Sequence, residues 1–81
     1  MRINPPEVAY FATIYRMWER SQMTRAWEVL GDSVATLCQA KGGWGKAQSW
    51  LAEYLPDLPQ KTLELALADH NLRTANKAIS N

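Results

Sequence analysis

The spacing of apolar side chains is the feature that most constrains this chain. From Val8 to Ile79, apolar residues recur at three- to four-residue steps, which is the period of one face of an α-helix. No segment alternates apolar and polar residues over several positions, so no strand is expected. The 81 residues provide room for one domain with one core. We therefore expect an all-α protein, a compact bundle of four to five short amphipathic helices in a single domain (residues 1–81), with a homodimer as one form it can adopt.

Two features divide the first half of the chain. Asn4 and Pro5 are typical of a helix start, and this first helix is expected to end near residues 21–22. The apolar series of residues 23–38 then keeps its phase across Gly31. This continuity favours one helix, straight or kinked, over two short helices joined by a turn at that glycine.

Glycine and proline divide the second half. Residues 41–45 contain three glycines and predict the strongest break, after which a helix from Trp44 is stopped by Pro56. Pro59 suits the start of a last helix, expected to run to about residue 79 unless residues 70–71 interrupt it. This segment carries leucine or isoleucine at seven-residue steps, at Leu58, Leu65, Leu72 and Ile79. Alanines lie between them at Ala68 and Ala75, and Leu63 and Leu67 form a second apolar flank.

Composition restricts the class of partner and the compartment. Nine Lys and Arg against eight Asp and Glu give a formal charge of +1, without the basic excess of most nucleic-acid-binding domains. Cys38 is the single cysteine, so neither an intrachain disulfide nor a paired-cysteine zinc site can form. The start of the chain has no signal-type apolar run, and no stretch approaches the roughly 18 apolar residues of a membrane span. We expect a cytoplasmic protein with no membrane contact.

The residue types that carry catalysis are scarce. Cys38 lies on an apolar stripe, and His70, the single histidine, is expected to cap or end a helix. The phosphate-loop reading of residues 43–46 is rejected, because Ala40 stands where its first glycine belongs and Ala47 follows the lysine. We expect no enzyme activity, no cofactor and no metal.

Nucleic-acid binding is the alternative function. Residues 43–45, Gly-Trp-Gly, resemble the Gly-apolar-Gly turn of helix-hairpin-helix modules, which implies Trp44 as an apolar plug and Lys46 as a phosphate contact. The resemblance covers a short segment and lacks the usual proline before the first glycine. Two stretches also have the outline of a helix-turn-helix, residues 24–39 around Gly31 and residues 46–71 around Pro56. Few side chains in these two stretches suit readout of bases, so both fit the motif poorly. For residues 43–45, an ordinary glycine-rich interhelical loop with its Trp packed in the core is preferred.

Aromatic residues indicate a protein partner instead. Four Trp and three Tyr are many for this length, and the apolar residues of positions 10–18 cover more than one face of their helix. Trp, Tyr and Arg are enriched at interface hot spots. We therefore expect a small regulatory or inhibitory module, of the kind carried by phages or plasmids, that binds a larger cellular complex; a DNA-binding transcriptional regulator is the alternative. The expected partner-binding residues are Tyr10, Arg16, Trp18, Arg20, Trp44 and Lys46.

Overall fold

The computed structural model describes residues 6–80, with side chains to residue 77, and this part of the chain is all-α. It forms four helices and no strand: α1 (Pro6–Ser21), α2 (Thr24–Lys41), α3 (Trp44–Tyr54) and α4 (Gln60–Ser80). The all-α prediction is confirmed, with four helices. The predicted helix start at Asn4 and Pro5 lies outside the described residues. No helix in residues 6–80 is both long and apolar enough to cross a membrane.

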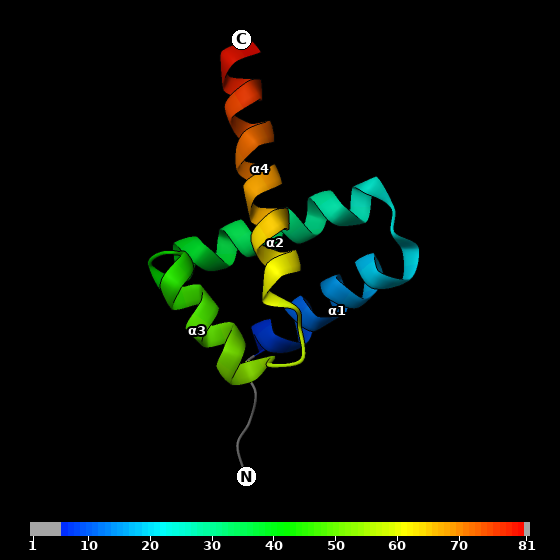
Figure 1. Ribbon diagram of the computed structural model, residues 1–81, viewed down its shortest axis with the longest axis vertical. Coiled ribbons are helices and arrows are strands. Elements are labelled where there is room, and N and C mark those ends of the chain that lie inside the picture. The colour runs from blue at the N-terminus through cyan, green and yellow to red at the C-terminus, as the bar shows by residue number, and fades with distance from the viewer. Residues whose placement is uncertain (1–5, 81) are drawn as a thin grey trace.

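Helix α2 is the centre of the molecule. It contacts each of the other three helices, and its contact with α4 is the most extensive. Figure 1 shows α1 and α2 running antiparallel, with α4 crossing α2 and extending beyond the rest of the fold. The second half of α4 therefore projects from the body of the protein.

The turns follow the residues that predicted them. The backbone N–H groups of Gly42 and Gly43 both donate to the carbonyl of Cys38, at 2.9 and 2.8 Å, and close the end of α2. Their φ angles of 92° and 127° lie in the region that glycine adopts at little cost. Helix α3 ends two residues before Pro56, and Pro59 accepts the first backbone hydrogen bonds of α4, as expected from the sequence.

Gly31 lies inside α2, which runs through it as one helix. The residue is buried, and a Cβ atom built there would lie 2.7 Å from the carbonyl oxygen of Ala66 in α4. The glycine therefore permits close approach of two helices instead of forming a turn. The helix-turn-helix outline of residues 24–39 is wrong for this reason.

The core lies where α2 meets the other helices. Its most enclosed large side chains are Leu30, Val34, Leu51 and Leu63. Trp18, Trp27, Trp44 and Trp50 pack half-buried around this centre. At one edge, the Lys41 ammonium lies 3.3 Å from the Glu7 carboxylate and 4.9 Å from the centre of a Trp50 ring, which ties α1, α2 and α3 together.

Helix α4 packs its second apolar flank, Leu63 and Leu67, against the core, whereas Leu65 and Leu72 of the seven-residue series face outward. Leu63 and Ala66 have no exposed surface, whereas Leu65 and Leu72 are 52% and 60% exposed. The helix continues through residues 70–71, so the expectation that His70 caps or ends a helix is wrong.

Candidate interaction surface

The solvent side of α1 carries a set of exposed residues that we name the α1 outer face: Tyr10, Thr13, Arg16, Met17 and Arg20. At about 100° per residue, these positions lie opposite the buried side chains of Phe11 and Tyr15. Tyr10 is 61% exposed and Met17 is 46% exposed. The fold therefore leaves an aromatic ring, a thioether and two guanidinium groups on one side of one helix.

The α1 outer face borders two hollows in the protein surface. Thr13, Met17, Ser21 and the two arginines line a shallow depression of about 510 Å³. Tyr10 stands at the edge of a separate, mostly apolar groove of about 310 Å³ between α1 and α2. Among residues 6–77, neither Arg16 nor Arg20 is paired with a carboxylate. Their donors are available to acidic groups outside the chain.

Three of the six predicted partner-binding residues lie away from the α1 outer face. Trp18 packs on Trp27, with ring centres 4.9 Å apart and planes inclined at 53°. Trp44 is half-buried against the core at the start of α3, and Lys46 is exposed in the same turn. Figure 1 places the start of α3 and the end of α1 at opposite sides of the molecule. The structure thus groups Tyr10, Arg16 and Arg20 but separates Lys46 from them.

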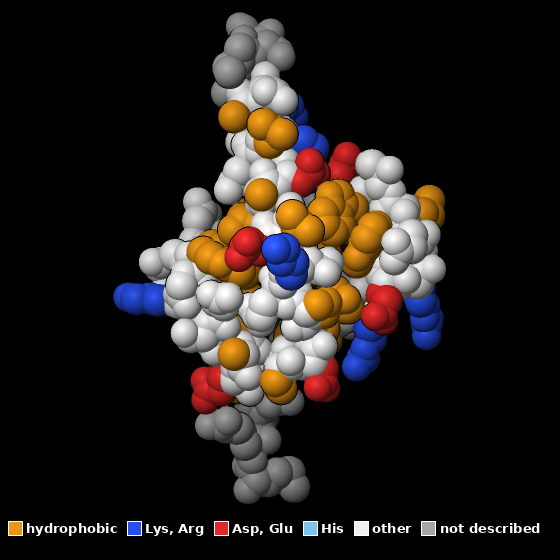
Figure 2. Space-filling view, viewed as in Figure 1, with side chains coloured by type: hydrophobic (Ala, Val, Ile, Leu, Met, Phe, Trp, Pro, Cys, Tyr) orange, Lys and Arg blue, Asp and Glu red, His pale blue; other side chains and the backbone are white. Residues whose placement is uncertain are grey.

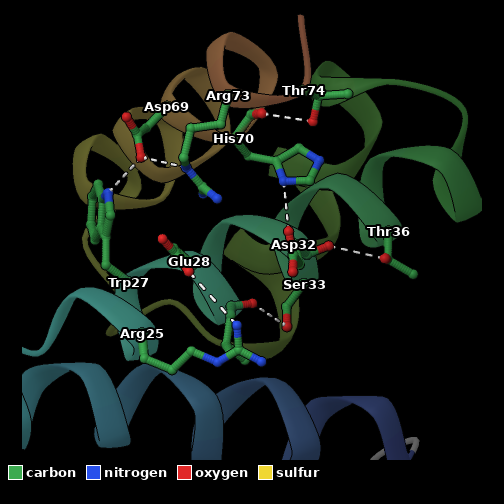
Figure 3. Close-up of polar contacts among 11 residues, drawn as sticks. Arg25, Trp27, Glu28, Asp32, Ser33, Thr36, Asp69, His70, Arg73 and Thr74 are labelled. Carbon is green, nitrogen blue, oxygen red and sulfur yellow. Dashed lines mark hydrogen bonds and ion pairs between the residues drawn. The ribbon is translucent and has the colours of Figure 1, made fainter. Parts of the chain in front are cut away.

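A polar cluster between α2 and α4 has no counterpart in the sequence-based expectations. The imidazole Nδ1 of His70 lies 2.7 Å from a carboxylate oxygen of Asp32 (Figure 3). The Trp27 indole N–H donates to Asp69 at 3.1 Å, and Arg73 donates to the same oxygen at 3.1 Å. The four-residue spacing of Asp69 and Arg73 was a signal for their own pairing. Their neighbours in α2 lie far away in the sequence, Asp32 at 38 positions from His70 and Trp27 at 42 positions from Asp69, and no sequence pattern indicates these contacts.

The chemistry of this cluster favours holding the helices together. Asp32 and His70 line a groove of about 610 Å³ together with Cys38 and Trp44. Burial raises the pKa of the Cys38 thiol, so the thiol is protonated at neutral pH and a poor nucleophile. No group of three His, Cys, Asp or Glu side chains within the described residues is arranged to hold a metal ion. We therefore take the α1 outer face, and not this groove, as the candidate functional site.

Comparison with protein-family models, with curated proteins and with solved structures finds no match for this chain.

Proposed function

We propose that this protein is a small regulatory module that acts by binding another protein through the α1 outer face. One observation carries the proposal: Tyr10, Met17 and two arginines are exposed on one side of α1, and their side chains form no hydrogen bond or ion pair among residues 6–77. Tyr and Arg are frequent anchors of protein interfaces, and Met adapts to irregular apolar surfaces.

The side chains of this face define the partner's chemistry. Two unpaired guanidinium groups one helical turn apart favour a surface with carboxylates at matching spacing. Tyr10 and Met17 add apolar area on the same side, so a wholly polar surface would leave that area uncovered. We infer a partner surface that is both acidic and apolar, in the cytoplasm, and a module that inhibits by occupying it. A homodimer is a separate part of the proposal, because the exposed leucines of α4 lie outside this face.

DNA binding is the competing function. The residues expected to contact phosphates lie on two helices: Lys46 is in the first turn of α3, and Arg16 and Arg20 are in the second half of α1. Figure 1 places the start of α3 and the end of α1 at opposite sides of the molecule. One continuous basic surface is the usual footprint of a DNA-binding protein, so this separation favours a protein partner.

Affinity capture from the source cell, after nuclease treatment and a high-salt wash, tests the proposal. The double variant Arg16→Glu/Arg20→Glu is compared with Lys46→Glu/Lys77→Glu, which makes the same change in net charge at exposed positions of α3 and α4. We expect the wild-type chain and the control to retain one stoichiometric protein, and the α1 variant to lose it. Circular dichroism verifies that all three chains are folded.

Binding of the purified partner then gives the magnitude. Tyr10→Ala is expected to weaken binding by roughly tenfold or more, as for an interface anchor. In a parallel capture without nuclease and at low salt, recovery of nucleic acid alone, lost at high salt and with Lys46→Glu/Lys77→Glu, would contradict the proposal and favour DNA binding. A captured protein that is indifferent to the α1 variants would reject the α1 outer face as the site.

A further inference from the structure

The outer side of α4 carries an apolar stripe that the fold leaves uncovered. The stripe consists of Leu65, Ala68, Leu72 and Ala75, and we name it the α4 seam. All four residues are exposed, the two leucines at 52% and 60%. Leu63 and Ala66, which have no exposed surface, occupy the opposite side of the helix against α2. The α4 seam therefore has no partner within residues 6–77.

The side chains at residues 74–77 of α4 are open to solvent. Residues 74–77 are exposed at four successive positions and so on every side of the helix. Figure 2 shows hydrophobic side chains continuing along this projecting part. An isolated helical segment is marginally stable in water, because most helical stability in proteins comes from packing of an apolar face. A partner lying along the α4 seam would supply that packing.

The order of large and small residues along the seam defines the partner. Leucine and alanine alternate at steps of three and four residues, which is the spacing of a coiled-coil seam. In an antiparallel pair centred on residue 70, Leu65 faces Ala75 of a second copy, and Ala68 faces its Leu72. Each layer then contains one large and one small side chain, so the layers have equal volume. A parallel pair would instead place leucine on leucine and alanine on alanine, leaving a space at each alanine layer.

Charge favours the same orientation. Lys61 is exposed and lies on the same side of α4 as the α4 seam, one turn before Leu65. In the antiparallel pair this ammonium lies beside the carbonyl end of the second copy's α4, where a cation is stabilised by the helix dipole. In a parallel pair the two Lys61 side chains would face each other. The pattern is therefore complementary to itself in one orientation, which distinguishes a second copy from an unrelated apolar partner.

We propose that the α4 seam pairs antiparallel with the α4 seam of a second copy of this chain. The projecting end of each α4 then lies along the base of the other, and the two bodies stand at opposite ends of the pair. This surface is distinct from the α1 outer face, so the proposal stands independently of the proposed function. Two helices of this length bury less area than a typical stable interface, so the dimer should dissociate on dilution.

Sedimentation velocity over a range of protein concentrations tests the pairing. Leu72→Glu places a charge in the centre of the α4 seam, and Met23→Glu places it at an equally exposed apolar residue between α1 and α2. We expect the wild-type chain and Met23→Glu to reach the dimer mass as concentration rises, and Leu72→Glu to remain a monomer with unchanged helix content. A wild-type chain that is monomeric at every concentration would overturn the proposal, and so would a Leu72→Glu chain that dimerises like the wild type.

Disulfide trapping tests the orientation. In a Cys38→Ser background, chains carrying Ala68→Cys are mixed with chains carrying Leu72→Cys, oxidised, and read by mass spectrometry. Antiparallel pairing gives mainly the mixed 68–72 disulfide, whereas parallel pairing gives mainly 68–68 and 72–72. Predominance of the like-to-like products would overturn the antiparallel arrangement.

Discussion

Replacement of Gly31 by alanine is the sharpest test of how α2 and α4 pack. An alanine Cβ would lie 2.7 Å from the Ala66 carbonyl oxygen and 3.1 Å from the Cβ of His70. Carbon–oxygen contacts between helices are usually about 3.3–3.6 Å, so α4 would have to recede by about 0.6 Å. A backbone carbonyl inside a helix cannot rotate away from such a contact. The shift would also lengthen the contact of Asp32 with His70, which is 2.7 Å long.

Two opposing terms give the expected change in the free energy of unfolding. Alanine is favoured over glycine inside a helix by about 1 kcal/mol. Overpacking against a rigid neighbour costs about 1–3 kcal/mol. We expect the packing cost to exceed the gain in helix propensity, so that Gly31→Ala lowers the free energy of unfolding by about 1 kcal/mol. For a domain of this size the melting temperature would fall by roughly 4–8 °C.

Gly45→Ala is the matched control, because Gly45 is also helical but has no atom within 4 Å of the added Cβ. Only the propensity gain operates there, so this variant should melt a few degrees above the wild type. Thermal unfolding followed by circular dichroism measures both variants under one condition. If Gly31→Ala raised the melting temperature as Gly45→Ala does, the close crossing of α2 and α4 would be refuted.

Three further predictions concern the core, the polar cluster and the thiol. Leu51→Ala truncates a side chain with no exposed surface and should lower the free energy of unfolding by about 2–5 kcal/mol. Leu72→Ala, measured in dilute solution, should change it by less than about 0.5 kcal/mol. Equal losses for the two variants in urea titrations would contradict the assignment of the core. Trp27→Phe removes the indole donor to Asp69 and should cost about 1 kcal/mol in the same assay, and a neutral result would mean that this hydrogen bond adds nothing. Burial raises the pKa of the Cys38 thiol, so the folded state holds this proton more tightly than the unfolded state does. The stability that this difference in pKa contributes should therefore be lost as pH rises from about 8.5 through the pKa of Cys38 in the folded state. A Cys38→Ala chain that loses as much stability at alkaline pH as the wild type would disprove this.

Local residue chemistry was enough to predict the order and ends of most helices. The glycines at positions 42 and 43 adopt φ angles that other residues avoid, and Pro59 directly precedes α4 and accepts the first backbone hydrogen bonds of that helix. The turn at the two glycines and the carbonyl contacts of Pro59 depend on a residue and its nearest neighbours along the chain. The apolar spacing of residues 23–38 likewise indicated one helix through Gly31, as the structure has it.

The sequence by itself therefore determined that this chain is helical, where its helices break, and which residue types are available for binding. The tertiary structure decided which flank of α4 is buried, because both flanks are apolar and periodicity cannot choose between them. The choice depends on α2: Gly31 admits the backbone at Ala66, and Asp32 holds His70 on the same side of α4. Leu65 and Leu72 are exposed as a consequence. Contacts between residues that are distant in the sequence made that decision, since the geometry that joins them exists only after the chain has folded.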